Sequence, residues 1–307
     1  WAPRTNFATA IWVSEMSRFF DLTLNGISFG MIYAAVALGL VLIWRATRIV
    51  NFAQGAMATL TTYVAVTLLD RSINYWLAFA VALLAGLAFG ALAERVFIRP
   101  LYGKPELNPV VVSIGLLILI ESLVGAIWGS GDRGFEPAFS QIGLVAGHTH
   151  LEFSHFDLFV LGSVLVLMLA MLVLFRRTNL GLRMRASAFA PEVARLLGVR
   201  VGRIFTTGWA FAGLAGALAG LLVAPKVLLS PNMMDPILVY GFAAAVLGGL
   251  DSPLGALVGG VGTGLGISYV GGYLGSSMQT TGAAIILIVV LSIRPEGIFA
   301  RAKARRV

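Results

Sequence analysis

One serine in this sequence sits in a pattern that could carry nucleophilic chemistry. Ser28 lies in Gly26-Ile-Ser28-Phe-Gly30, which matches the G-x-S-x-G pattern of serine hydrolases. That pattern works on a strand-to-helix turn with a histidine partner, whereas Ser28 lies inside an apolar stretch and the three histidines lie together far along the chain. The match is therefore coincidental. We expect no catalytic residue in this chain, and we expect Ser28→Ala to abolish no activity.

The histidines are the second group that could do chemistry. His148, His150 and His155 fall within eight residues, near Glu152 and Asp157, so a metal site is conceivable. Their spacing matches no zinc signature, and a solvated loop is the favoured interpretation. The chain has no cysteine to supply thiolate ligands, and no G-x-x-x-x-G-K-[ST] loop to hold ATP phosphates. We therefore expect neither a bound metal nor ATP hydrolysis in this chain.

The ionisable residue deepest in an apolar run is Glu121, within Val110–Trp128. Burying a carboxylate inside a membrane costs free energy, so such a residue is a candidate for a functional site. Two interpretations are open: an acid that couples transport to an ion, or a hydrogen-bonded residue that joins helices. Two amides, Asn51 and Gln54, begin another apolar run and either line a polar path or cap an interrupted helix.

The basic segment 176–205 contains the clearest local helix signal. Pro191 suits a first helical position, Glu192 suits the first turn, and Gly198 suits a helix stop. The pattern predicts a two-turn helix in a loop between apolar runs. So short a helix is not stable alone and must dock on something.

The apolar face of this short helix consists of Val193, Leu196 and Leu197, spaced at i, i+3 and i+4. Two docking partners are open, namely the protein's own bundle or a cytoplasmic partner with an acidic rim. Arginines that would suit the second alternative flank the helix at positions Arg183, Arg185, Arg200 and Arg203.

The elements that position these residues are membrane spans. The chain is 58% hydrophobic and only 12% charged, with a mean hydropathy of +0.90, against about 25% charge in ordinary soluble domains. Runs such as Phe156–Phe175 are continuously apolar without a period of two, which favours helices over a barrel. The fold expected is an all-α polytopic bundle of about eight or nine spans, at Leu22–Trp44, Ile49–Leu69, Tyr75–Ala93, Val110–Trp128, Phe156–Phe175, Phe205–Val223, Ile237–Leu250, Leu254–Val270 and Met278–Ile293.

Charge placement predicts the orientation of the spans. Most of the 22 Lys and Arg residues fall in loops on one side, which the positive-inside rule assigns to the cytoplasm, so the N-terminus is expected outside and the C-terminus inside. We expect one transmembrane domain over 1–307, with an external loop at 129–155 and a cytoplasmic coupling loop at 176–205. The net charge of +8 is dispersed, which disfavours nucleic-acid binding, and Trp1–Phe20 does not resemble a removable signal peptide.

Glycines recur at four-residue spacing within the spans, which places them on one helix face and lets helix backbones approach closely in lipid. The spacing predicts a tightly packed bundle. The pairs are Gly26 and Gly30, Gly86 and Gly90, Gly216 and Gly220, Gly255 and Gly259, and Gly260 and Gly264.

Several segments together resemble the permease subunits of the branched-chain amino-acid family of ABC importers. Gly30–Leu40 with Ile49–Gly55 is similar to the first two spans of that family, although histidine often occupies the position of Gln54. The remaining resemblance lies in Glu94-Arg95 with Arg99–Leu101, in Pro191–Gly198, in Ala245–Pro253 and in Arg294–Gly297. A Glu-Val-Ala sequence stands at 192–194 where Glu-Ala-Ala is usual.

The resemblance implies a translocation subunit rather than an enzyme, in the bacterial cytoplasmic (inner) membrane and in contact with lipid. The expected partners are a second homologous permease, two ATP-binding subunits that hold ATP and Mg²⁺, and an extracytoplasmic solute-binding protein that delivers branched-chain or other hydrophobic amino acids. The alternative is an ion-coupled secondary transporter that uses Glu121.

The residues and the resemblance together predict roles for two groups of residues. The expected ATPase-coupling residues are Pro191, Glu192, Val193, Ala194, Arg195, Leu196, Leu197 and Gly198. The expected substrate-path residues are Ser28, Tyr33, Asn51, Gln54 and Glu121.

Overall fold

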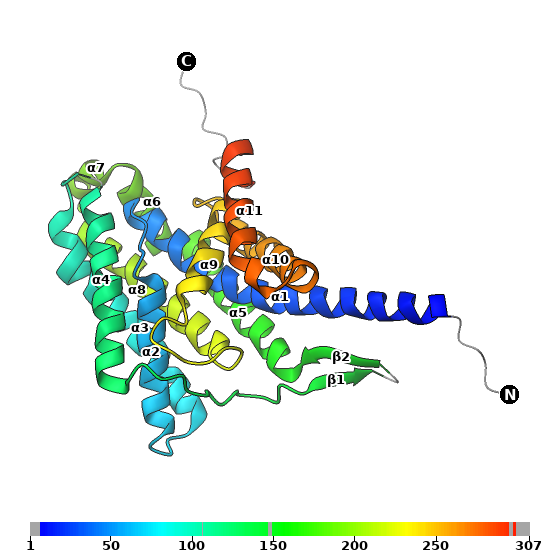
Figure 1. The fold of residues 1–307 in the computed structure, drawn as a ribbon. Helices are drawn as coiled ribbons and strands as arrows, with labels where there is room; N and C mark the ends of the chain where they lie inside the picture. Colours follow the sequence, from blue (N-terminus) through cyan, green and yellow to red (C-terminus); the bar gives the residue numbers. More distant parts are fainter. Residues whose placement is uncertain (1–6, 106, 147–148, 295–296, 299–307) are drawn as a thin grey trace.

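The computed structural model describes residues 7–105, 107–146, 149–294 and 297–298, and within them the chain is mainly helical (Figure 1). The helices are α1 (Phe7–Thr47), α2 (Gln54–Leu69), α3 (Tyr75–Ala93), α4 (Leu107–Trp128), α5 (His155–Arg177), α6 (Asn179–Phe189), α7 (Pro191–Leu196), α8 (Val201–Val223), α9 (Asp235–Gly248), α10 (Pro253–Tyr269) and α11 (Gln279–Ile293). A π-helical turn, Glu94–Ile98, and a 3-10 turn, Arg99–Leu101, extend α3, and a π-helical turn, Val270–Leu274, extends α10.

Each of the nine expected spans corresponds to a helix. Within the described residues, seven helices are long and apolar enough to cross a membrane, counting α3, α10 and α11 with their adjoining turns. The other two, α2 with 16 residues and α9 with 14, are shorter than the about 20 residues that a bilayer core requires. The expectation of an all-α polytopic bundle is confirmed, while the orientation stays a prediction.

Some helix boundaries differ from those expected. Helix α1 begins at Phe7 rather than Leu22, because no glycine or proline interrupts the intervening residues. Its 41 residues span about 60 Å at 1.5 Å per residue, about twice the bilayer core, and its N-terminal part extends away from the other helices (Figure 1). Helix α8 begins at Val201 rather than Phe205, and α2 begins at Gln54 rather than Ile49.

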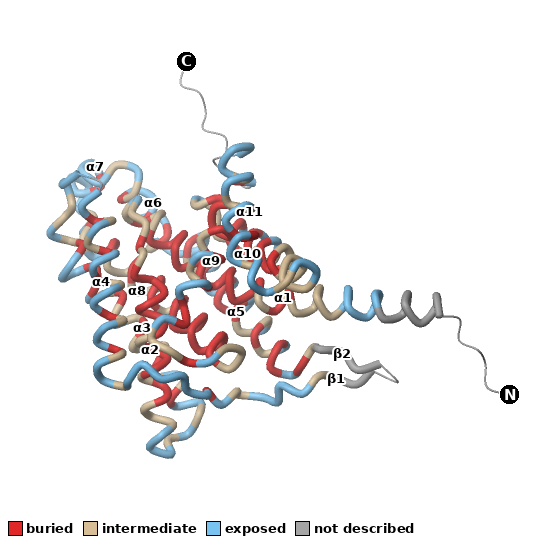
Figure 2. Tube along the Cα trace, viewed as in Figure 1, coloured by how far each residue is buried: buried red, intermediate tan, exposed pale blue. Residues whose placement is uncertain are grey.

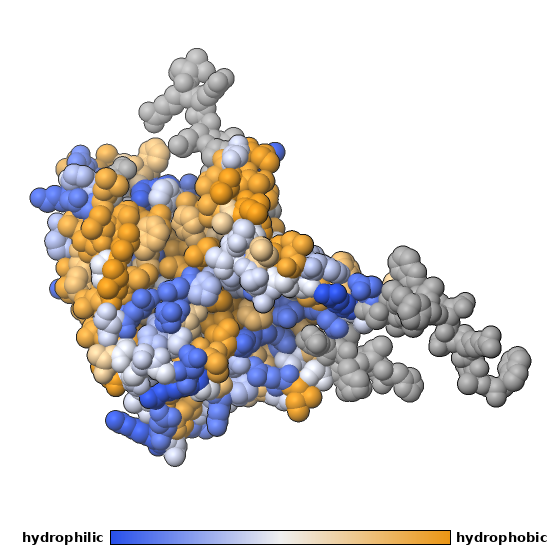
Figure 3. Space-filling model, in the orientation of Figure 1, coloured by the Kyte–Doolittle hydropathy of each residue, from blue (hydrophilic) through white to orange (hydrophobic). Residues whose placement is uncertain are grey.

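Burial separates central helices from peripheral ones (Figure 2). Within an apolar 18-residue stretch of each helix, the buried share is 89% for α1 and 72% for α8. The corresponding shares for α4 and α11 are 22% and 11%. Apolar side chains cover the outer faces of α4 and α11 in the space-filling view (Figure 3), as expected for surfaces in contact with lipid. Helices α1 and α8 therefore form the centre of the bundle.

The spaced glycines lie where helices touch, as predicted. Gly30 and Gly264 face each other between α1 and α10, and Gly86 and Gly90 face α8. A Cβ atom placed on Gly90 would lie only 2.2 Å from the carbonyl oxygen of Trp209, so the two backbones are in direct contact there.

The two ends of the bundle carry different structures. At one end, strands β1 (Gly143–Ala146) and β2 (Thr149–Ser154) form an antiparallel hairpin that was not expected from the sequence and that leads directly into α5. The opposite end carries α6 and α7 (Figure 1). We call them the hairpin end and the coupling end.

Candidate functional site

Helix α7 forms as the local sequence predicts, over Pro191–Leu196. Gly198 has a φ of +80°, the left-handed conformation that glycine adopts without strain, and the chain turns there toward α8. The amide of Val199 donates a hydrogen bond to the carbonyl oxygen of Ala194 at 2.9 Å. This bond holds α7 to Val199, in the short loop that leads into α8 at Val201. Helix α6, which was not expected from the sequence, precedes it and ends at Phe189.

The apolar face of α7 does not dock on its own bundle. Leu196 is 88% exposed and Leu197 is 79% exposed, and Val193 is also exposed, whereas Ala194 is buried beneath them. Phe189 at the end of α6 is 84% exposed beside them in the chain. These side chains, Val193, Leu196, Leu197 and Phe189, form what we call the coupling patch, and exposed arginines flank it at Arg183, Arg185, Arg195, Arg200 and Arg203.

Beside α7 lies a group that we call the Glu94 cluster, formed by Glu94, Arg99, Tyr102 and Thr206. Glu94 is fully buried, and Arg99 binds both of its oxygens, at 3.2 Å through Nε and at 2.9 Å through a terminal nitrogen. Tyr102 donates to the same carboxylate at 3.1 Å and Thr206 donates at 2.7 Å. Burial, and next the Glu94 carboxylate, raises the pKa of Tyr102, so its hydroxyl keeps the proton that it donates.

At the hairpin end lies a second buried acid, in what we call the Asp157 cluster of Ser28, Ser154, Asp157 and Lys226. Asp157 forms a capping box with Ser154 at the start of α5 and accepts a hydrogen bond from Ser28 of α1 at 2.6 Å. Lys226, from the segment after α8, makes an ion pair with Asp157 and also lies over the ring of Phe29. The cluster joins three segments of the chain.

Asn51 and Gln54 lie together in a packed region rather than beside an open path. Both are buried, and Asn51 donates to Gln54 at 3.3 Å while its own oxygen caps the amide of Ala53 at 3.1 Å. Gln54 donates to the carbonyl oxygen of Ala212 in α8 at 2.7 Å. In this conformation Asn51 stabilises the turn before α2 through the amide of Ala53, and Gln54 connects the first residue of α2 to α8.

The other expected path residues lie apart from Asn51 and Gln54. Tyr33 is buried and packs edge-on against Tyr240, with the ring centroids 5.3 Å apart. Glu121 lies beside the carboxyl group of Asp235 at the start of α9. Ser28 belongs to the Asp157 cluster. The structure thus distributes the five residues among four separate contact groups, and their role in a substrate path stays a prediction.

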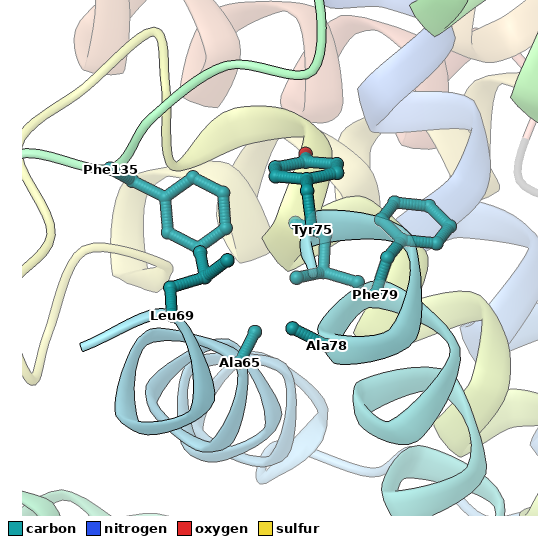
Figure 4. A pocket seen from close by; sticks show the side chains of 7 residues that line it. Ala65, Leu69, Tyr75, Ala78, Phe79 and Phe135 are labelled. Atoms are coloured by element: carbon teal, nitrogen blue, oxygen red, sulfur yellow. The ribbon is translucent and has the colours of Figure 1, made fainter. Parts of the chain in front are cut away.

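An apolar hollow lies between α2, α3 and α8 toward the hairpin end (Figure 4). It is lined by side chains that include Leu69, Tyr75 and Phe135, and its empty space, about 130 Å³ including open solvent, leaves no room for a molecule the size of water. Ligand sites usually enclose about 300 Å³ or more and present a few polar groups. The hollow is therefore a packing defect rather than a substrate chamber.

The histidines do not form a described site. His148 lies outside the described residues, the side chain of His150 is likewise not described, and His155 is exposed at the start of α5. Within the described part of the chain, no group of three or more acidic or histidine side chains has the arrangement of a metal site.

Sequence reasoning did not find the partners in the two buried clusters. Ser154 and Asp157 have the spacing of a capping box, which is a local signal that could have placed the start of α5. No comparable signal connects Glu94 with Thr206, or Asp157 with Lys226, because these residues meet only through helix packing.

Comparison with known proteins identifies the family to which this chain belongs. The family model described as the branched-chain amino acid transport system / permease component matches residues 22–293. The chain is 28% identical to the high-affinity branched-chain amino acid transport system permease protein BraD of Pseudomonas aeruginosa, over 95% of this chain and 99% of BraD. It is 27% identical to LivH of Escherichia coli K12, over 94% and 98% of the two chains, and 32% identical to a probable LivH of Methanocaldococcus jannaschii, over 89% and 90%.

Among solved structures, PsaBC from Streptococcus pneumoniae in complex with a Fab shares the fold, with a TM-score of 0.50 and 13% sequence identity. The similarity covers 94% of this chain and 98% of that chain.

Proposed function

The chain belongs to the family of branched-chain amino acid transport system permease components, and from that premise we propose that it forms one of two permease subunits of an ATP-driven importer of branched-chain amino acids. A permease component is a translocation subunit, so ATP and Mg²⁺ would be held by two separate ATP-binding subunits. An extracytoplasmic binding protein would deliver the solute at the hairpin end. Family membership favours this function over an ion-coupled secondary transporter.

The observation that carries the proposal is the coupling patch. Leu196 and Leu197 expose most of their surface on a helix of only six residues, outside the membrane spans. Exposed apolar side chains with a polar rim are typical of a protein interface, and burying one leucine contributes about 2 kcal/mol. The flanking arginines suit an acidic rim on the partner. These features support α7 as the segment on which an ATP-binding subunit acts.

The proposed mechanism follows from the connection between α7 and the bundle. ATP binding would bring the two ATP-binding subunits together and displace α7, which a short loop, hydrogen-bonded to α7 through Val199, joins to α8. Helix α8 is central and mostly buried, so its movement would alter the packing around it. The path between the permease subunits would then open alternately to the two sides.

The experiment is uptake into proteoliposomes that contain the complete complex. We expect uptake of labelled leucine, isoleucine or valine to require both enclosed ATP and external binding protein. Uptake by this chain alone, driven by an ion gradient, would reject the proposal and favour secondary transport.

A variant of the coupling patch tests the role of α7 in the same assay. Leu196→Asp is expected to reduce uptake by about tenfold or more, because a charge would be desolvated at the interface. Membrane insertion should be unchanged, since Leu196 is 88% exposed. The matched control is Ile142→Asp, which alters a residue that is 80% exposed at the hairpin end and should not weaken ATPase binding. Equal effects of the two variants on ATPase co-purification would contradict this role.

A further inference from the structure

One route from α7 into the bundle passes through the first turns of α8, which contact Glu94 and Arg99 at the end of α3. The carbonyl oxygen of Gly202 accepts a hydrogen bond from Arg99 at 3.0 Å, and Thr206 contacts Glu94 one helical turn later. Both residues lie within ten positions of the end of α7 in the chain. The cluster is therefore a charged connection between the start of α8, close to the coupling loop, and the end of α3.

The cluster is built as a rigid joint. Glu94 has no exposed surface, and its carboxylate is held by Arg99 through two nitrogens and by two hydroxyl groups. A buried carboxylate is strongly unfavourable unless such partners stay in place, so the cluster resists separation. Glu94 also begins a π-helical turn, a local departure from α-helix that often occurs at functional positions.

The contact continues below the cluster without gaps between the helices. A Cβ atom on Gly86 would lie 2.6 Å from the carbonyl oxygen of Gly213, and one on Gly90 would lie 2.2 Å from that of Trp209. The pairs run in opposite directions along the chain, so α3 and α8 are antiparallel and in backbone contact over several turns. A joint at the end of such a contact prevents the two helices from sliding past each other.

On its other side, the described neighbours of α8 near Gly208 are apolar. Near Gly208, α8 faces Ala46 of α1 and Met184 of α6, both apolar. Apolar surfaces of this kind slide and repack with little change in energy compared with the rupture of a buried ion pair. A force on α8 is therefore transmitted more directly to α3 than to α1.

We propose that Glu94 and Arg99 are positioning residues that make α3 and α8 move as one body when α7 is displaced. The inference rests on the proposed function, because it assigns the route by which ATP binding reaches the membrane path. Neither residue contacts ATP or the solute in this assignment. Their contribution is to the coupling between ATP hydrolysis and import.

The test is the number of solute molecules imported per ATP hydrolysed, measured in proteoliposomes with the complete complex. Glu94→Gln keeps the size of the side chain but removes the charge that holds Arg99 and replaces one acceptor oxygen with an NH2 donor, so the side chain no longer accepts all the hydrogen bonds of Arg99, Tyr102 and Thr206. We expect the variant to assemble and hydrolyse ATP while import per ATP falls about fivefold or more, as for loss of a typical coupling between two sites. A purely structural role would lower the yield of complex without changing this ratio in the complexes that assemble.

A second pair of variants keeps the test decisive if Glu94→Gln does not assemble. Thr206→Val removes only the hydroxyl that contacts Glu94, whereas Thr207→Val removes a neighbouring hydroxyl that bonds within α8, to the carbonyl oxygen of Arg203. We expect a reduced ratio for Thr206→Val and a wild-type ratio for Thr207→Val. An unchanged ratio in an assembled Glu94→Gln or Thr206→Val complex overturns the inference. If the wild-type complex itself does not import, the proposed function has failed, which is a distinguishable result.

Discussion

Both ends of the bundle contain a buried acid held by one base and two hydroxyl groups, yet the two clusters connect different parts of the protein. At the coupling end, Glu94 joins α3 to α8, two spans that are in contact over several turns. At the hairpin end, Asp157 joins the start of α5 to α1 and to the segment after α8. The first cluster connects two long elements that can move together, and the second fixes segments that enclose the end of the bundle.

The bases also differ in their access to water. The Lys226 side chain is 13% exposed, whereas the Arg99 side chain is 36% exposed. Removing the acid therefore leaves a more deeply buried cation at the hairpin end than at the coupling end. The comparison indicates that the Asp157 cluster contributes mainly to stability and the Glu94 cluster mainly to coupling.

Asp157→Asn should have the largest effect on stability. The change leaves Lys226 buried without its counter-ion, and breaking a buried pair in this way costs about 3–5 kcal/mol. We expect a lower melting temperature in detergent and a lower yield of folded protein. The control is Asp251→Asn, which breaks the exposed Arg48–Asp251 pair, in which both side chains are more than half exposed, and should change stability little. Equal melting temperatures for the two variants would contradict the structural role of Asp157.

Gly90→Ala should have an intermediate effect, because it inserts a methyl group between α3 and α8. The Cβ would lie 2.2 Å from the carbonyl oxygen of Trp209, so the helices must separate, at a cost of about 1–3 kcal/mol. Gly115→Ala is the matched control, since a Cβ on this glycine of α4 meets nothing within 4 Å. Thermal unfolding in detergent distinguishes them. A Gly90→Ala protein as stable as Gly115→Ala would show that the backbone contact is not tight.

Glu121→Gln should have the smallest effect, because Glu121 belongs to neither cluster. Its neighbour is another acid, Asp235, so replacement of the carboxyl group leaves no cation without a partner. We expect wild-type stability and wild-type import at every pH between about 5 and 8. Loss of import, or import whose pH dependence changes in this variant, would instead assign Glu121 a role in proton coupling.

The sequence predicted the features that depend on neighbouring residues. Helix α7 follows from Pro191 and Gly198, and close packing of α3 against another helix follows from the spacing of Gly86 and Gly90, although the spacing does not identify α8 as that helix. The clusters could not be predicted, because Glu94 and Thr206 are 112 positions apart and Ser28 and Asp157 are 129 apart. The roles of Asn51 and Gln54 could not be decided from the sequence either. Their amides are compatible with a polar path or with a helix cap, and only the packing around them distinguishes the two.

The proposed mechanism requires contact between α7 and an ATP-binding subunit. Because the chain contains no cysteine, this contact can be measured directly by cross-linking of single introduced thiols. Leu196→Cys and Ile142→Cys each introduce a single thiol on an exposed residue, one at the coupling end and one at the hairpin end. With a short thiol-reactive cross-linker in membranes that contain the complete complex, we expect Leu196→Cys to cross-link to the ATP-binding subunits and Ile142→Cys to give no such product. Cross-linking of the ATP-binding subunits through Ile142→Cys, or none through Leu196→Cys in an assembled complex, would contradict the account.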